Sequence, residues 1–184
     1  TLLTKSIQVA MFFMTTTIYA QNNFQREWDH RYGGTKNEKL KVFLPTYDKG
    51  YLLAGSSLSI NDGDKTQGSN GSWDYYVVRT DSAGVRLWDA RFGGSLEDEL
   101  TCVLQTGDGG FLLGGFSRSG ISGDKSEANW DQTTHNYADY WIVKINAQGV
   151  KQRDKRFGGI YEDKLNSSVI SGDDGYLLGG HSLS

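Results

Sequence analysis

Three segments of this chain are spelled almost alike, and each ends in an arginine, an aromatic residue and two glycines. They cover residues 28–34, 88–94 and 153–159, so the second begins 60 residues after the first and the third 65 residues after the second. A fixed period of this length is typical of repeat architectures, in which one unit cannot bury its apolar face alone. The chain is therefore expected to stack similar units against one another.

Each unit contains short runs of β-branched and aromatic residues that are bounded by Gly, Asp and Asn. This pattern predicts strands joined by turns, and no segment keeps an apolar period of 3.6 residues long enough for a helix. We predict four strands per unit. The first is expected at 39–46, 99–106 and 164–171, the second at 51–57, 111–117 and 176–182, the third at 74–81 and 139–146, and the fourth at 85–92 and 150–157.

The second and third strands are apolar at consecutive positions, which indicates a sheet that is covered on both faces. Four-stranded antiparallel sheets packed face to face around an axis form a β-propeller. We therefore predict an all-β, β-propeller-like fold with blades of about 60 residues, incomplete at about two and a half blades. A β-sandwich or a β-solenoid is the alternative architecture.

The N-terminus differs from the repeats. Lys5 precedes an apolar run at 7–14 and a small residue, Ala20, which together predict a secretory signal peptide over 1–20. The remaining residues, 21–184, form one partial repeat domain with units at about 35–94, 95–159 and 160–184. Because the chain starts with Thr and stops within a repeat, we expect a fragment of a longer protein.

Composition argues against several functional classes. The net charge is −3 and no Lys/Arg cluster is present, so no nucleic-acid partner is expected. The single cysteine, Cys102, is expected to be an inert buried thiol, and no Cys/His spacing indicates zinc. We predict no metal or other cofactor, and no membrane span once the leader is removed.

The recurring polar residues have structural explanations. In the turns at 46–50, 106–110 and 171–175, a hydroxyl and a carboxylate are expected to accept turn N–H groups, and the last glycine to supply a positive φ. The acidic residues that follow each Gly-Gly pair are expected to pair with the repeated arginines, and Tyr32, Phe92 and Phe157 to fill the seam between units. These acidic residues are Glu38, Glu97, Asp98, Glu162 and Asp163.

The second unit carries five extra residues within the stretch 129–137, which predict a loop insertion. Trp130 and Tyr137 in this loop are the candidate ligand contacts, because rim loops carry function and Trp and Tyr are common interface anchors. Packing within the loop is the alternative role for both. No catalytic residue is predicted, since every repeated residue is explained by a turn or a strand end.

The repeated residues resemble a known pattern. Trp-x-x-x-aromatic-Gly-Gly, Asp-Gly-Gly-Tyr/Phe, Gly-Asp-Lys-Ser/Thr and Asp-Tyr-Trp/Tyr-x-Val-Lys/Arg, over about residues 28–184, are similar to repeats of secreted bacterial β-propeller-like proteins. Such proteins often carry a C-terminal type IX secretion sorting domain, which this chain does not contain. The resemblance implies a secreted, extracellular or cell-surface location.

Together these observations predict a binding, adhesion or scaffold module rather than an enzyme. The expected partners are a carbohydrate or protein ligand and further blades of the parent protein. A propeller-type glycoside hydrolase or lyase is the alternative, and it would need paired acidic residues on one rim.

Overall fold

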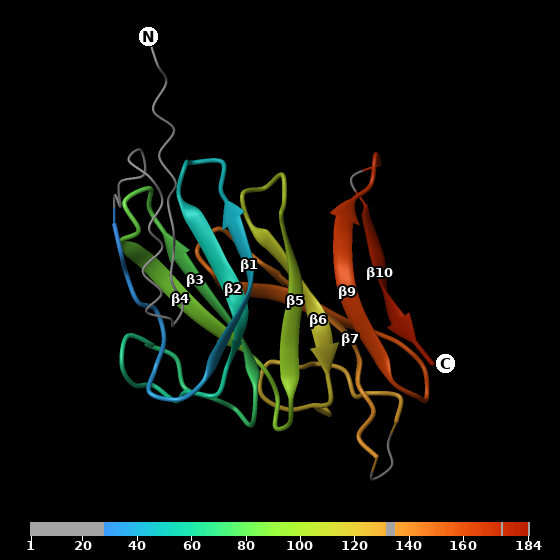
Figure 1. Cartoon of the computed structure of the whole chain (residues 1–184). Helices are drawn as coiled ribbons and strands as arrows, with labels where there is room; N and C mark the ends of the chain where they lie inside the picture. The colour runs from blue at the N-terminus through green and yellow to red at the C-terminus, as the bar shows by residue number, and fades with distance from the viewer. Residues whose placement is uncertain (1–27, 132–134, 174, 184) are drawn as a thin grey trace, which may run out of the picture.

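The computed structural model describes residues 28–131, 135–173 and 175–183, so the predicted signal peptide lies outside the described residues. This part of the chain contains no helix and folds into ten strands in three antiparallel sheets (Figure 1). The first sheet contains β1 (Glu38–Pro45), β2 (Tyr51–Ser57), β3 (Asp74–Thr80) and β4 (Arg86–Phe92). The second contains β5 (Asp98–Gln105), β6 (Phe111–Ser117), β7 (Asp139–Ile145) and β8 (Lys151–Phe157), and the third β9 (Asp163–Ile170) and β10 (Tyr176–Ser182).

The all-β prediction is confirmed, and each predicted strand is found within one residue of its expected bounds. In each sheet, strands that follow one another along the chain also pair with one another. The equivalence of the units extends to the hydrogen-bond register. β1 has a bulge between Leu40 and Val42, and β5 has one between Leu100 and Cys102.

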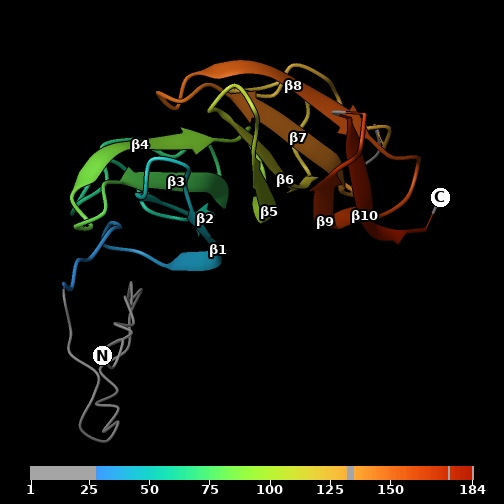
Figure 2. The same cartoon turned by 90° about the horizontal axis from the view of Figure 1, so that it is seen from above.

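The three sheets follow one another around an open arc (Figure 2). The first strands of the sheets, β1, β5 and β9, lie on the inner side of this arc and contact one another in turn. β4 and β8 lie on the outer side. Successive sheets therefore meet face to face, which is why their second and third strands are apolar at consecutive positions.

The largest apolar core lies between the first and second sheets. Residues of β2 and β3 enter it from one side, and residues of β5, β6 and β7 from the other. Tyr75 and Trp141 are fully buried at its centre, with ring centroids 4.9 Å apart. A smaller core between the second and third sheets contains Cys102, which is buried as predicted and accepts a hydrogen bond from Ser168.

The expected seam aromatics behave differently along the chain. Tyr32 and Phe92 are buried, whereas Phe157 is 46% exposed, so the prediction is wrong for Phe157. Phe92 packs in the core between two four-stranded sheets. The sheet that follows Phe157 has only two strands, so less apolar surface is available to cover its ring.

The predicted turns are present, but two of their residues act differently from the prediction. The hydroxyl donates to the carboxylate instead of accepting an N–H group, and the last glycine does not supply the positive φ. Asp48 accepts hydrogen bonds from the Thr46 hydroxyl and the Gly50 amide, and the other two turns repeat both bonds. The positive φ falls one residue earlier, at Lys49 (70°) and, in the next unit, Gly109 (78°). Gly50 is needed for space instead, because a Cβ there would lie 2.2 Å from the carbonyl oxygen of Thr80.

Two of the repeated arginines, Arg31 and Arg91, have partners other than the acidic residues predicted for them. Arg31 and Arg91 bind Asp64 and Asp124, which lie in the loop of the following sheet, at 2.9 and 2.6 Å. Three of the predicted acids have other partners because the second glycine of each Gly-Gly pair turns its amide toward them. Glu38, Asp98 and Asp163 accept the amides of Gly34, Gly94 and Gly159, and Glu97 and Glu162 bind Arg118.

Candidate ligand-contact rim

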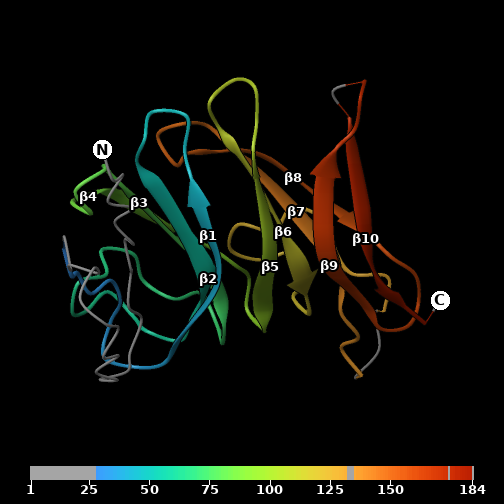
Figure 3. The ribbon, with the colours of Figure 1, turned by 45° about the horizontal axis from the view of Figure 1, so that its top comes forward.

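The loops fall into two groups at opposite ends of the sheets. The tight turns that join the first and second strands lie at one end, and the long loops after β2 and β6 lie at the other (Figure 3). Loops held by a rigid scaffold are the usual place for binding residues. The loop after β6 contains both sequence-predicted contacts, Trp130 and Tyr137.

Asn129 closes the base of this loop. Its side-chain amide donates to the carbonyl oxygens of Ser117 and Tyr137, at 2.7 and 3.0 Å. Its side-chain oxygen accepts a 2.7 Å bond from the ammonium group of Lys125, a residue whose pKa burial lowers to about 8. The loop therefore leaves and rejoins the sheet at a fixed place.

Arg118, at the start of the loop, binds the end of the loop near Asn136 and two acidic residues outside it. Its guanidinium group binds Glu97 at 2.9 Å and Glu162 at 2.6 Å, and donates to the carbonyl oxygen of Asn136 at 2.9 Å. Burial alone would raise the pKa of Glu162, but hydrogen bonds from Arg118, Lys164 and the Ala138 amide hold this pKa at about 2. The carboxylate thus stays charged near neutral pH and keeps its three donors.

Trp130 presents its ring to solvent from this anchored base. Its backbone amide donates a 2.9 Å bond to Asp139 at the start of β7, while the side chain is exposed. The guanidinium carbon of Arg156 lies 4.7 Å from the ring centroid, within the range of a cation–π interaction. The indole is therefore held by its backbone and its charged neighbour while much of its ring surface remains open.

Tyr137 is half-buried and belongs to an aromatic group of its own. Its ring stacks on His135 with centroids 5.4 Å apart, and meets the edge of Tyr161 at 6.0 Å. Tyr161 and its neighbour Ile160 are exposed beside it. The structure thus places Trp130 and Tyr137 in one loop but gives them different ring partners.

Tyr161, His135 and Arg156 were not among the predicted contact residues. For Tyr161 a signal was present, because its equivalents in the other units are Lys36 and Leu96, so an aromatic replaces a non-aromatic residue there. Arg156 belongs to the repeated Arg-aromatic-Gly-Gly motif, so nothing in the sequence indicated a contact with Trp130 that is particular to this unit. His135 lies in the insertion and has no equivalent in the first unit.

The carboxyl groups with raised pKa values lie between the sheets and not on the rim. Asp98 and Asp139 are almost fully buried, and burial raises the pKa of each to about 6. Asp139 also feels the negative charge of Asp163 across the junction of the second and third sheets. The rim itself offers aromatic faces, hydroxyl groups and the Arg118–Glu162 ion pair, which suit binding through stacking and hydrogen bonds.

Within the described ranges, no group of three or more His, Cys, Asp or Glu side chains is arranged to hold a metal ion. His30 and His135 lie in different aromatic pairs, with Trp28 and Tyr137 respectively. The same part of the chain contains no helix with the length and apolar character needed to cross a bilayer.

Comparison with known proteins gives no assignment: no protein-family model matches the chain, and no curated protein matches its sequence.

Proposed function

We propose that this chain is a secreted or cell-surface binding module, used for adhesion or scaffolding, whose units pack as the blades of a β-propeller. The proposal of blades is supported by the repeated contacts between successive sheets. Tyr75 of the first sheet lies over Gly115 of the second, and Tyr140 of the second lies over Gly180 of the third. Equivalent junctions repeated in one direction are what a radial arrangement requires.

The observation that carries the binding role is the contrast between repeated and non-repeated residues. The repeated Asp, Arg and Gly residues are used in turns and in contacts between sheets, such as Asp48 with Thr46 and Arg91 with Asp124. Trp130 and Tyr161, in contrast, are exposed aromatic residues on one rim, without an aromatic equivalent in another unit. An exposed ring on a rigid loop is suited to stack on the apolar face of a sugar or to anchor a protein partner.

The proposed location rests on the sequence at 1–20, which has the cationic start, apolar core and small closing residue of a signal peptide. Export by the type IX route remains part of the proposal through the resemblance of the repeats. Detection of the protein in culture medium or on intact cells, with its N-terminus at residue 21, would test this part.

A glycan array probed with the full chain tests the binding role, followed by a pull-down of extracellular proteins. We expect a ligand that the Trp130→Ala variant binds at least about tenfold more weakly, as for an aromatic anchor. Tyr47→Ala is the matched control, because Tyr47 is 72% exposed and lies in the turn after β1, at the opposite end of the sheets. Equal binding by both variants would refute a role for this rim.

A further inference from the structure

We propose that Lys125 and Asn129, at the base of the loop after β6, join their side chains in an intramolecular isopeptide bond, with Asp139 as the proton carrier. This is a modification that the folded chain makes on itself. It concerns the base of the loop and does not depend on whether Trp130 binds a ligand.

The nucleophile is a buried amine. Lys125 is 2% exposed, and its ammonium group donates to two uncharged oxygens, Oδ1 of Asn129 at 2.7 Å and the carbonyl oxygen of Glu127 at 2.6 Å. Burial lowers the pKa of this group to about 8, and among the neighbouring charges Asp139 opposes this effect most strongly. The neutral amine, which is the nucleophilic form, is therefore populated near neutral pH.

The electrophile is the amide carbon of Asn129, a residue that is 5% exposed. The amide nitrogen donates to the carbonyl oxygens of Ser117 and Tyr137, so the orientation of the amide group is fixed while its oxygen faces Lys125. Because a C=O bond is about 1.23 Å long, Nζ of Lys125 lies within about 3.9 Å of Cγ of Asn129. A shift of less than about 1 Å brings these two atoms to the roughly 3–3.5 Å separation of a near-attack conformer.

The proton carrier is the carboxyl group of Asp139, a residue that is 1% exposed. Its Oδ2 accepts a 2.9 Å bond from the amide of Trp130, the residue after Asn129, which places the carboxyl group next to the reacting pair. Its Oδ1 is buried and has no hydrogen-bond partner in the part of the chain that the structure describes. Burial raises the pKa of Asp139 to about 6, so this carboxyl group can both take up and release a proton near neutral pH.

The reaction needs no outside reagent. Asp139 takes a proton from the Lys125 ammonium group, and the neutral Nζ attacks Cγ of Asn129. As the Nζ–Cγ bond forms, Asp139 gives its proton to Nδ2 and takes a second proton from Nζ. The Cγ–Nδ2 bond then breaks, and ammonia leaves as ammonium once it accepts that second proton. The product is a secondary amide, and nothing is oxidised or reduced.

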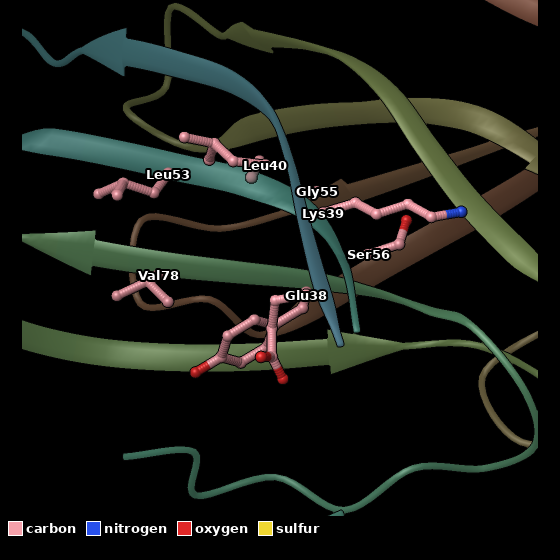
Figure 4. A pocket seen from close by; sticks show the side chains of 9 residues that line it. Glu38, Lys39, Leu40, Leu53, Gly55, Ser56 and Val78 are labelled. Carbon is pink, nitrogen blue, oxygen red and sulfur yellow. The ribbon is translucent and has the colours of Figure 1, made fainter. Parts of the chain in front are cut away.

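The first unit contains an equivalent buried lysine in different surroundings. Lys65 donates to the carbonyl oxygen of Ser59 at 2.6 Å, and its ammonium group lies over the ring of Tyr76. Tyr76 also lines the small pocket of Figure 4, in which the carboxylate of Glu38 accepts the Ser59 hydroxyl. The acceptor of this lysine is thus a backbone carbonyl group and not a side-chain amide.

Ser69 occupies the place of Asn129 in the first unit. In both units the next residue donates its backbone amide to the acidic residue that begins the third strand, Asp74 or Asp139. The first unit therefore has the lysine and the acid but lacks the amide carbon, and it serves as an internal control.

The bond would close a ring over residues 125–129 at the place where the Trp130 loop leaves the sheet. It would hold the base of this loop as a disulfide holds a loop elsewhere. The chain has a single cysteine, so an internal disulfide cannot do this.

Trypsin digestion of the denatured full chain, followed by mass spectrometry, tests the bond. Trypsin cleaves after Arg118 and Lys144 but not after a lysine whose amine is acylated. We expect one peptide of residues 119–144, lighter than its sequence mass by about 17 Da, the mass of the ammonia released when the amine displaces it. The chain should be cleaved normally after Lys65.

Separate peptides of residues 119–125 and 126–144 at their sequence masses would overturn the proposal. A loss of about 17 Da confined to 126–144, with cleavage after Lys125, would overturn it as well, because it indicates a cyclic imide at Asn129 instead of attack by the lysine amine. The wild-type digest thus decides whether the bond exists, even where a variant does not fold.

Three variants separate the roles of the residues. Asn129→Ser, which introduces the residue of the first unit, should abolish the mass loss and restore cleavage after Lys125. Asp139→Asn should slow bond formation, followed in samples taken over time after expression, by about a hundredfold or more, as expected for the loss of a proton carrier. Asp74→Asn, the matched change in the first sheet, should leave bond formation at the wild-type rate. Equal rates in Asp139→Asn and wild type, or equal slowing in both Asp variants, would overturn the role of Asp139.

Discussion

The carboxylate of Asp74, at the start of β3, lies directly against Gly93, which follows β4. A Cβ at Gly93 would be 2.0 Å from Oδ1 of Asp74, and the equivalent distance from Gly158 to Asp139 is 2.6 Å. The first glycine of the repeated Gly-Gly pair is therefore a site of close contact with a buried acidic side chain.

Gly93→Ala should therefore destabilise the chain, by about 1–3 kcal/mol, because an added methyl group must displace a buried carboxylate. Urea unfolding followed by tryptophan fluorescence measures the change. Gly107→Ala is the matched control, since no heavy atom lies within 4 Å of a Cβ at Gly107. If the two variants unfold at the same urea concentration, the close contact is not important for stability.

Tyr75→Phe removes the hydroxyl that joins the first sheet to the second and leaves the carbonyl oxygen of Trp141 without that bond. We expect a loss of about 0.5–1.5 kcal/mol in the free energy of unfolding, the net contribution of one buried hydrogen bond, because Trp141 keeps its strand partners in β6 and β8. Tyr47→Phe should cost nothing measurable, because Tyr47 is largely exposed. A neutral Tyr75→Phe would argue that this hydrogen bond does not hold the two sheets together.

Asp98 should make the chain more stable at mildly acidic pH. Burial raises its folded-state pKa to about 6, while an Asp in an unfolded chain titrates near about 3.9. The folded state therefore binds the proton more tightly, so this contribution is complete below about pH 4 and is lost as the pH rises through about 6.

Asp98→Asn should remove this pH dependence. Compared with the variant, the wild-type chain should gain about 1–3 kcal/mol of stability between pH 7 and pH 4. Glu162 acts in the opposite direction, but its contribution is lost only as the pH falls from about 4.3 toward its folded pKa of about 2. Parallel stability–pH curves for wild type and variant would contradict the raised pKa.

The third sheet should cause the chain to associate with itself. Leu177 on β10 is 66% exposed, whereas its equivalents Leu52 and Leu112 are buried in cores between sheets. An exposed apolar face beside an unpaired strand edge favours association. Leu177→Lys should lower the sedimentation coefficient measured at high concentration, and Tyr47→Lys should leave it unchanged. A wild-type chain that sediments as a monomer at every concentration would contradict this prediction.

Much of the fold could be read from the repeat, because strand length and turn chemistry are local. The turn bonds of Asp48, for instance, involve residues only two positions away. The partners of the arginines could not be read in this way. Arg91 binds Asp124, which lies 33 residues later in a loop of the neighbouring sheet, so the pairing depends on how the sheets face one another.

The candidate site was predicted only in part, for a similar reason. Trp130 stands out as an aromatic residue in an insertion, but its neighbour Arg156 comes from the end of β8. Tyr161 comes from the connection into the third sheet and meets Tyr137 only after folding. Sequence spacing marks the insertion, but it does not show which distant side chains the fold brings beside it.

The central claim is that successive sheets pack through equivalent tyrosine–glycine junctions. Nuclear Overhauser effects between tyrosine ring protons and glycine Hα protons test this most directly. Equivalent junctions predict cross-peaks for both pairs, Tyr75 with Gly115 and Tyr140 with Gly180. A cross-peak for one pair without the other, or for neither, would show that the units do not pack alike and would contradict the account.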